Sequence, residues 1–580
     1  MRIRCDECAH EFLRAFSCKR RFFRPSCHAK RLAIWTQWLD TALLALVPHR
    51  IRPRGHPLLR QSPSAAGVSR PRRAREHATY FPHRDWISHP APHESLMRLL
   101  SSRCLTLCAL AVAPSLAEAQ AAIDYQTDFS KEEFAARRAR IYDAIGTQGI
   151  AVVQGTSGVP GFSVVRQSND FYYLSGVESA HAYLLLNGRS RRSTLYLPHR
   201  EEDRERSEGK ILSVEDSLLL VQLTGVDRVR GLEHLSQDLV GADLLRPPAM
   251  TLHTPLAPME TGNDSRDELL AGRARIASDP WDGRPSREAH FVRLVKERFP
   301  QFEVRDLSPT IDTLRAIKSP AEIALIRRAT QLAGLGIIEA MRSTSPGVFE
   351  YQLDAAAKYV FYLNGARGDG YASIIAGGTN AFLGHYFRKS DALRDGDLVL
   401  MDYAPDYRYY TSDVTRIWPV NGTFTAAQAA LYEYIVAYRD ALFRHVKPGV
   451  TSDEVLDRAA AEMRQYLVGK TFASPAHLKA VQQGVTFRGH FQHPVGMAVH
   501  DVGRIRGVPL RPGMVFTIDP MIWIPEEQLY IRIEDVALVT ADGVENLSGF
   551  VPTRIADVQR TIAEAGLVQL QKPVPPPAGR

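Results

Sequence analysis

The chain has 580 residues, of which 45% are hydrophobic and 23% are charged, and 72 Lys and Arg against 64 Asp and Glu give a formal net charge of +8. These proportions are ordinary for globular proteins, and the length suits two or three domains with full cores. All six cysteines precede residue 109, which excludes a disulfide scaffold and a thiolate metal site from the remaining chain.

The first 96 residues differ in charge from the rest. They hold 18 Lys and Arg against 7 Asp and Glu, a net +11, which leaves a net −3 for residues 97–580. The basic run Arg70–Arg75 is typical of nucleic-acid contact, and the first four cysteines have a spacing compatible with a zinc knuckle. We favour a third interpretation, in which residues 1–96 are a basic extension that reflects a mis-annotated start or is disordered. Because the remainder is slightly acidic, we expect no nucleic-acid partner.

A secretory signal peptide is predicted over residues 97–119. Met97–Arg103 forms a short basic start, Cys104–Ala113 an apolar core, and Ala117–Ala119 a cleavage site of small residues. Because such a signal stands at a chain start, we expect translation to begin there and the mature protein to be exported, periplasmic or secreted, after cleavage near Ala119. N-terminal sequencing of the native protein tests this. No other stretch reaches the roughly 18 apolar residues that a membrane-spanning helix needs.

An α/β domain is predicted over residues 120–310. Ser130 is the expected N-cap of a first helix, with Glu133 completing a capping box. Apolar runs then predict buried strands at Gly149–Val153, Ala182–Leu186 and Ser193–Leu197. Helices and strands alternate, as they do in α/β folds. Residues 245–288 are rich in Pro, Gly and Asp and predict a long surface excursion.

A second domain is predicted over residues 311–565, followed by a Pro-rich tail at 566–580. The start of a long amphipathic helix is indicated by Ser319, Pro320 and Glu322, because Ser is a favoured N-cap and Pro is favoured in the first turn.

The second domain contains an internal repeat. Leu393–Gly396 precedes an apolar strand that ends at Asp402, and Leu510–Gly513 precedes a similar strand that ends at Asp519. In both copies the Asp comes nine residues after the Leu, and Pro-Gly-Val follows a long helix in both halves. Two copies of a helix–helix–strand unit predict a pseudo-twofold domain, and the whole chain is expected to be α/β (α+β).

Each repeat carries a second acid. Asp413 lies 11 residues after Asp402, and Glu534 lies 15 residues after Asp519. Both gaps suit antiparallel strands that return the second acid beside the first. Acids in apolar strands are rare unless they are paired or bind metal. Four converging carboxylates therefore predict two divalent cations, and an imidazole from the segment 489–501 makes the donor set suitable for Mn, Co, Zn or Fe.

At these residues the chain resembles the pita-bread metallopeptidases, in the branch of Xaa-Pro aminopeptidase (aminopeptidase P) and prolidase. The resemblance covers about residues 125–550 and implies a creatinase-like N-terminal domain before a pita-bread catalytic domain. The segments that carry it are Arg166–Gly176, Ile317–Ile323, Gly384–Tyr386, Asp402, Ser412–Arg416, His493, His500–Gly503 and Arg532–Asp535.

The resemblance implies an active site and a mechanism. The implied metal ligands are Asp402, Asp413, His493, Asp519 and Glu534. The implied catalytic residues are His385, His500, Asp519 and Arg532, and the implied substrate contacts are His385, His490, His500 and Arg532. In the family, two divalent ions, with Mn expected, share a bridging hydroxide that attacks the scissile carbonyl, and Asp413 and Glu534 bridge the metals.

Two positions depart from the family pattern. Asp519 stands where the family usually has Glu, and Gly489 stands where aminopeptidase P members often have His, with His490 beside it. The shorter Asp519 side chain predicts a change in rate and in metal preference. The implied reaction is hydrolysis of the Xaa-Pro bond at the N-termini of proline-containing peptides. A prolidase that cleaves only dipeptides and a non-catalytic peptide-binding module are the alternatives, and the family implies a homo-oligomer, a dimer or a tetramer.

Overall fold

The computed structural model describes residues 2–4, 11–13, 125–158, 164–241, 250–262 and 264–571. The chain divides into two compact units, Met1–Cys108 and Ala109–Arg580. In the first unit, strands β1 (Arg2–Arg4) and β2 (Glu11–Leu13) pair antiparallel. The cysteines of the zinc-knuckle alternative, the basic run, the predicted signal peptide and residues 572–580 lie outside the described residues.

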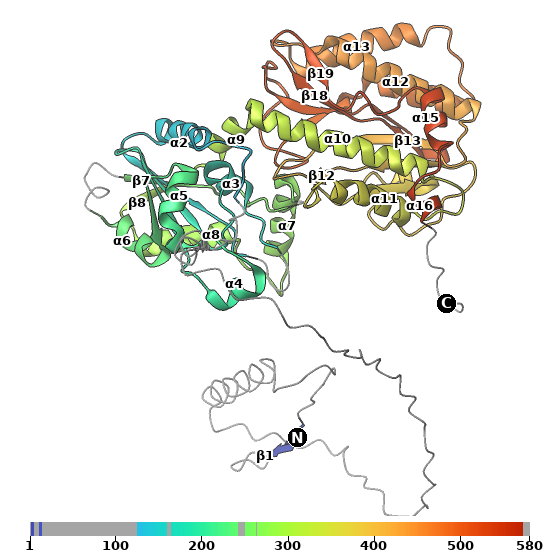
Figure 1. Ribbon diagram of the computed structural model, residues 1–580. Coiled ribbons are helices and arrows are strands. Elements are labelled where there is room, and N and C mark those ends of the chain that lie inside the picture. The colour runs from blue at the N-terminus through green and yellow to red at the C-terminus, as the bar shows by residue number, and fades with distance from the viewer. Residues whose placement is uncertain are drawn as a thin grey trace, which may run out of the picture. The chain divides into compact units, whose positions relative to one another are not determined.

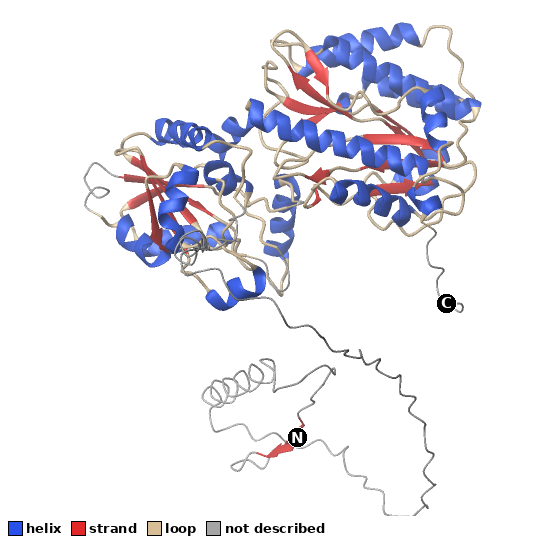
Figure 2. Cartoon of the chain, viewed as in Figure 1, coloured by secondary structure: helices blue, strands red, loops and turns tan. Residues whose placement is uncertain are grey.

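The second unit begins with an α/β domain built on a six-stranded sheet (Figure 2). Its strands are β3 (Gly149–Gln154), β4 (Tyr183–Asn187), β5 (Arg192–Leu197), β6 (Arg228–Gly231), β7 (Met250–Thr254) and β8 (Phe302–Asp306). They lie in the order β6-β5-β4-β3-β7-β8. The central pairs β3–β4 and β4–β5 are antiparallel, and the outer pairs are parallel. The three strands predicted from apolar runs are β3, β4 and β5, so that prediction is confirmed.

Both faces of this sheet are buried at its centre, which explains why the inner strand β3 is apolar over most of its length. Along β3, Ile150 and Val152 pack into one apolar cluster, whereas Ala151 and Val153 belong to another. Alternate residues of a strand point to opposite faces, so both clusters draw on the same strand. The helices of this domain are α2 (Lys131–Ile145), α3 (Asn169–Ser175), α4 (Glu202–Glu208), α5 (Ser217–Thr224), α6 (Leu235–Leu239), α7 (Arg266–Ser278), α8 (Arg287–Arg298) and α9 (Ser308–Ala316).

The N-terminus of α2 is capped by Ser130 as predicted, but Glu133 has different partners from those of a capping box. Ser130 Oγ accepts a hydrogen bond from the Glu133 backbone N–H at 3.3 Å. The Glu133 carboxylate accepts from Arg137 at 2.8 Å and from Ser319 Oγ at 2.7 Å. Glu133 therefore ties α2 to the residue that begins the next domain's first helix.

The prediction of a surface excursion at residues 245–288 is wrong for β7, which is an inner strand between β3 and β8. The helix α7, of 13 residues, has no buried residue and lies at the surface as predicted. The β7 signal is weak because so short a strand needs few buried apolar side chains, here Leu252, which is 0% exposed. The Pro, Gly and Asp residues around β7 therefore dominate the composition of residues 245–288, on which the prediction depends.

The second domain repeats one sheet arrangement twice. Its strands are β9 (Gly368–Asp369), β10 (Ile374–Gly377), β11 (Leu398–Asp402), β12 (Pro405–Asp406), β13 (Thr415–Pro419), β14 (Phe491–Pro494), β15 (Val515–Ile518), β16 (Met521–Ile524), β17 (Leu529–Arg532), β18 (Asp535–Val539) and β19 (Val544–Asn546). One sheet has the order β10-β11-β13 and the other β14-β15-β18-β19, with antiparallel neighbours throughout. The repeated strands are β11 and β15, each central in its half, which confirms the pseudo-twofold prediction.

Two pairs of long helices accompany the two sheets (Figure 1). The pairs are α10 (Pro320–Arg342) with α11 (Glu350–Leu363), and α12 (Ala426–His445) with α13 (Ser452–Tyr466). Ser319 caps α10 through the predicted capping box with Glu322. The shorter helices are α14 (Pro475–Thr486), α15 (Ile555–Ile562) and α16 (Leu567–Leu570).

A buried group of charges, which we call the hinge cluster, joins the two domains. It consists of Asp170, Glu260, Arg266, Arg315, Lys318 and Asp501. Arg315 donates hydrogen bonds to Asp170 and Glu260 at 2.7 Å each and to Asp501 at 2.5 Å. With Asp312, which accepts from Arg266 at 2.6 Å, four carboxylates share three cations. Burial raises the pKa of Asp501, but Arg315 and Lys318 outweigh burial and hold it below its ordinary value.

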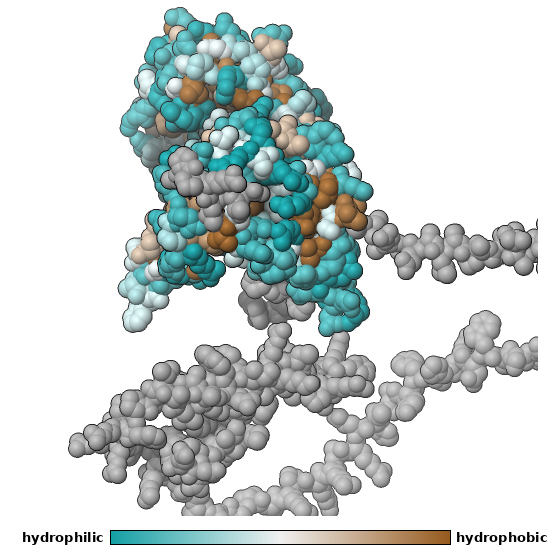
Figure 3. Space-filling model, turned by 90° about the vertical axis from the view of Figure 1, so that its left-hand side faces the viewer, coloured by the Kyte–Doolittle hydropathy of each residue, from teal (hydrophilic) through white to brown (hydrophobic). Residues whose placement is uncertain are grey.

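The surface and the helices of the second unit bear on the expectation that no segment spans a membrane. The face drawn in Figure 3 is mainly hydrophilic, with small groups of hydrophobic residues between polar ones. Across the described part of the chain, no helix is both long and apolar enough to cross a bilayer. α10 has 23 residues but carries Glu322, Arg327 and Arg328 within its first half.

Candidate metal centre

Asp402 and Asp413 are brought together by the first sheet. Asp402 is the last residue of β11, and its cross-strand partner is Thr415, the first residue of β13. Asp413 lies two residues before Thr415, so the chain returns it beside Asp402, as the spacing predicted. Each of the two acids is 3% exposed.

Asp519 and Glu534 occupy the corresponding places in the second sheet. Asp519 directly follows β15, the hairpin β16–β17 extends from there, and Glu534 directly precedes β18. An antiparallel bridge pairs Glu534 with Thr415, which links the two sheets at this point. Thr415 Oγ1 also donates to Glu534 Oε2 at 3.0 Å. The repeat therefore brings all four acids to one place.

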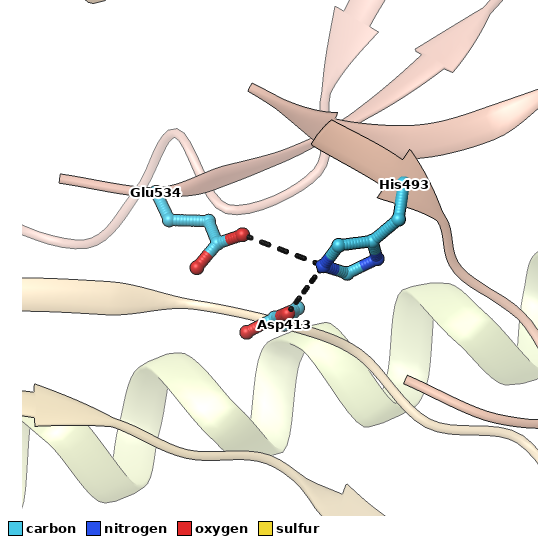
Figure 4. Close-up of side chains that lie close together, drawn as sticks. All are labelled: Asp413, His493 and Glu534. Carbon is cyan, nitrogen blue, oxygen red and sulfur yellow. Dashed lines mark ion pairs between the residues drawn. The ribbon is translucent and has the colours of Figure 1, made fainter. Parts of the chain in front are cut away.

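β14 adds the imidazole of His493 to this group (Figure 4). His493 Nε2 lies 3.4 Å from Asp413 Oδ2 and 4.0 Å from Glu534 Oε1. The possible ligand atoms of these three residues all lie within 4.8 Å of one another. Nδ1 lies 3.1 Å from the Pro494 carbonyl oxygen, a contact that favours a proton on Nδ1 and leaves Nε2 free to bind metal. Burial lowers the pKa of His493 to about 3, which keeps the ring neutral.

The Arg532 guanidinium bridges three of the four carboxylates. It donates from Nε to Asp519 at 2.8 Å, from one terminal nitrogen to Asp402 at 2.9 Å, and from the other to Glu534. Burial lowers the pKa of Arg532, but the three carboxylates outweigh burial and raise it well above its ordinary value. Arg532 therefore stays charged and fixes the orientation of these acids.

Tyr371 supplies a second donor to the first pair of acids. Its hydroxyl lies 2.6 Å from Asp402 Oδ1 and 2.9 Å from Asp413 Oδ1. Burial raises the pKa of Tyr371 well above its ordinary value, and the two carboxylates raise it further, so the phenol remains a donor. The sequence analysis missed this residue, because it lies between β9 and β10, outside the repeated strands and outside any recognised motif.

The charges of this centre are not balanced by the protein. Within the described residues, four carboxylates face one guanidinium and a neutral imidazole. Burial raises the pKa of Asp413 and Asp519 well above the ordinary value, and it raises the pKa of Glu534. Glu534 Oε1 is buried and has no hydrogen-bond partner among the described residues, although it faces His493 Nε2. An oxygen-rich donor set with one imidazole and an unsatisfied carboxylate oxygen fits divalent cations.

The two remaining histidines that were predicted to be catalytic have different settings. The His500 ring lies 4.2 Å from the His493 ring, centroid to centroid, and therefore borders the metal centre. His385 follows the 3₁₀ turn Gly378–Phe382, is exposed, and stacks near Phe387 at 6.1 Å. The structure thus places His500 beside the predicted ligands, while His385 lies exposed at the surface.

His490 has a structural setting rather than the predicted substrate contact. Its side chain is 0% exposed, Nε2 donates to the Gly484 carbonyl at 2.7 Å, and Nδ1 accepts from the Met521 N–H at 3.2 Å. Burial lowers the pKa of His490 to about 4. The Asp519 N–H donates to the His490 carbonyl at 3.0 Å. Nδ1 and the backbone carbonyl of His490 thus hold the backbone on either side of Pro520, so we assign His490 to support of the segment that carries the predicted ligand Asp519.

Three family models match parts of the chain. The aminopeptidase P N-terminal domain matches residues 134–243, and metallopeptidase family M24 matches residues 324–541. The transposase zinc-binding domain matches residues 1–52, which agrees with the zinc-knuckle spacing of the first four cysteines.

Curated relatives and solved structures cover most of the second unit. Xaa-Pro aminopeptidase of Haemophilus influenzae is 30% identical over 465 residues, which are 75% of this chain and 98% of the relative. Xaa-Pro aminopeptidase 3 of Rattus norvegicus is 31% identical over 415 residues, which are 68% of this chain and 76% of the relative. The structure of aminopeptidase P from E. coli with the inhibitor Pro-Leu is similar with a TM-score of 0.60 and 27% identity, covering 75% of this chain and 98% of that one.

Proposed function

The chain belongs to the M24 family of metallopeptidases, and on this premise we propose that it is an aminopeptidase that hydrolyses the Xaa-Pro bond at peptide N-termini with two divalent metal ions. The observation that carries the proposal is the excess of buried carboxylate at the centre, where four acids face one guanidinium. The names of the relatives and of the similar structures support the choice of an Xaa-Pro bond.

Five residues of this chain would hold the ions. Asp413 and Glu534 both face His493 and are the pair best placed to be shared, Asp402 would complete one site, and His493 with Asp519 would complete the other. Mn is the expected metal, and Co, Zn and Fe suit the same donors. When bound, such ions supply a hydroxide nucleophile at neutral pH and polarise the scissile carbonyl.

The chain's other groups would orient and move protons. Arg532 and Tyr371 fix the carboxylates by hydrogen bonds, which a metal centre needs because ligand orientation controls its affinity. We propose that His500, whose ring lies 4.2 Å from that of His493, exchanges a proton with the reacting peptide. His385 is proposed to join it when substrate is bound.

Two further proposals concern the protein's setting. We propose export through the predicted signal peptide at residues 97–119, and we propose a homo-oligomer. Mass measurement of the native protein tests the first, because a mature N-terminus near Gln120 is expected. Light scattering of the purified protein tests the second, because a dimer or tetramer is expected.

The activity is tested with two substrates. Purified protein is freed of metal, loaded with Mn, and given an Xaa-Pro-Yaa tripeptide beside an Xaa-Pro dipeptide. Cleavage of the tripeptide that stops on addition of a chelator supports the aminopeptidase. Cleavage of the dipeptide alone would make the chain a prolidase, and failure to cleave either, together with no bound metal, would favour a peptide-binding module.

A further inference from the structure

His500 is held by a helix that belongs to the other domain. The helix is α7, whose N-cap is Ser265. Ser265 Oγ accepts a hydrogen bond from the His500 backbone N–H at 3.2 Å, and Asp267 Oδ2 lies 2.8 Å from His500 Nδ1. Ser265 makes no side-chain bond to its own helix, so its hydroxyl serves His500 instead. Two residues two positions apart thus hold the main chain and the ring of a single histidine.

Both sides of this contact are anchored in the hinge cluster. Arg266, between the two gripping residues, donates to Asp312 at 2.6 Å and lies 3.5 Å from Glu260. Asp501, the residue after His500, accepts from Arg315 at 2.5 Å and lies 3.2 Å from Lys318. The start of α7 and the segment 500–501 are therefore fixed against the same buried charges. This anchoring holds Asp267 Oδ2 and His500 Nδ1 at 2.8 Å from each other.

The contact defines which nitrogen of His500 is free. A carboxylate at Nδ1 requires the proton on Nδ1, and in a neutral imidazole this leaves Nε2 as the acceptor. The His500 ring lies 4.2 Å from the ring of the metal ligand His493. The Asp267 side chain is 60% exposed and that of His500 is 30% exposed, so an ion pair of this kind contributes little to folding stability. A large effect of Asp267 on turnover would therefore report its action on His500.

We propose that Asp267 is a positioning residue, which sets the ring orientation and tautomer of His500 so that Nε2 exchanges the proton in the proposed peptidase reaction. The proposal rests on the proposed function, because His500 must act on the peptide. It gives the N-terminal domain a part in the chemistry through a carboxylate that the sequence analysis assigned to a surface excursion. Nothing in the local sequence marks Asp267, since its partner lies 233 residues away.

A double-mutant cycle tests the proposal. We would measure kcat and KM on an Xaa-Pro-Yaa tripeptide for wild type, Asp267→Ala, His500→Ala and the double variant. Asp267→Ala should lower kcat by roughly 10- to 100-fold, the range found when a partner that orients an active-site histidine is removed. KM should change less than twofold. Asp267→Asn keeps an acceptor for Nδ1–H and should retain most of the activity. In the His500→Ala background, Asp267→Ala should have no further effect.

The matched control is Glu268→Gln, an exposed acid on the same turn of α7, which should leave kcat and thermal stability unchanged. Wild-type kcat in Asp267→Ala, or an independent loss in the double variant, would overturn the proposal. If wild-type protein cleaves no tripeptide, the proposed function has failed. The effect of Asp267 on the His500 tautomer is then tested by NMR, which needs no enzymatic activity. The ¹⁵N spectrum of the imidazoles should then show His500 with its proton on Nδ1, and a change of tautomer in Asp267→Ala; an unchanged spectrum would overturn it.

Discussion

Two buried groups of acidic residues in this chain differ in how their charge is balanced. In the hinge cluster four carboxylates, with Asp312 counted, share three cations, whereas in the metal centre four carboxylates face the single guanidinium of Arg532. Arg315 and Lys318 hold the pKa of Asp501 below its ordinary value, whereas burial raises the pKa of Glu260 in the same cluster and raises that of Asp413 in the metal centre well above its ordinary value. The two groups therefore differ in the number of cations for each carboxylate, which is smaller in the metal centre.

The contrast is sharpest between two neighbours in sequence. Glu534 faces the metal centre, and burial raises its pKa. Asp535 points to Arg416 at 2.7 Å and Arg439 at 3.4 Å, and these guanidinium groups outweigh burial and lower its pKa. Successive residues where a strand begins point to opposite sides, so one side chain is placed for structure and the next for a ligand.

The largest expected effect is that of Asp413→Asn. This change removes a carboxylate that faces both His493 and Tyr371. The lost charge stabilisation is several kcal/mol, and about 1.36 kcal/mol corresponds to a factor of ten in rate, so turnover should fall by at least about 10³-fold. Thermal unfolding with and without Mn provides a second measurement, since Mn should stabilise wild type and not the variant. Asp395→Asn, at an exposed acid before β11, is the control. Equal stabilisation of both proteins by Mn would remove Asp413 from the site.

Asp535→Ala is expected to act on folding instead. Removing this partner leaves the buried Arg416 without its carboxylate, and breaking such a pair lowers the free energy of unfolding by about 3–5 kcal/mol. Glu534→Gln should leave the metal-free protein equally or more stable, because it relieves repulsion. Urea unfolding of both metal-free variants makes the comparison. Equal destabilisation by both changes would contradict the assignment of the two neighbours.

Asp519→Ala is expected to weaken metal binding, because one of the five proposed ligands is lost. Turnover should fall by about 10²-fold, since each 1.36 kcal/mol added to the activation free energy lowers the rate by a factor of ten. Asp519→Glu keeps a carboxylate and restores the residue type usual in the family, so it should remain active. Titration of metal into each protein, together with kcat, measures both properties. Wild-type activity in Asp519→Ala would exclude this residue as ligand and as base.

The smallest expected effect is on pH dependence. In the metal-free fold, Asp413 and Glu534 keep protons that the unfolded chain releases above their ordinary values of 3.8 and 4.5. The metal-free protein should therefore lose stability as the pH rises above about 4.5. Asp501 acts in the opposite direction: its lowered pKa stabilises the fold above 3.8, and this contribution is lost at lower pH. Unfolding from pH 4 to 8 should show this decline, and Mn should reverse it; a flat metal-free profile would contradict the account.

The convergence of the four acids could be predicted from the sequence because it depends on local rules. An acid at the end of a repeated apolar strand and a second acid after a hairpin must return to the same edge, and Asp402, Asp413, Asp519 and Glu534 do so. The domain order and the capping of α10 were predictable for the same reason, since caps and strand runs are written in a few consecutive residues.

The rest of the site depends on packing between distant segments. Tyr371 reaches Asp402 from another loop, and Asp267 reaches His500 across 233 residues. No periodicity or motif links such residues. His490 shows the converse, because its neighbours in sequence suggested a substrate contact, whereas its burial and two backbone hydrogen bonds give it a supporting role.

The most direct test of the central claim is a count of bound metal. Metal-free protein would be titrated with Mn by calorimetry, and the product would be analysed for metal per chain. The unmatched carboxylates predict two divalent ions per chain, reduced in Asp413→Asn and unchanged in Asp501→Asn if that variant folds. Failure of the protein to bind Mn, Co or Zn would contradict the account, because four buried acids beside one arginine would then need another explanation.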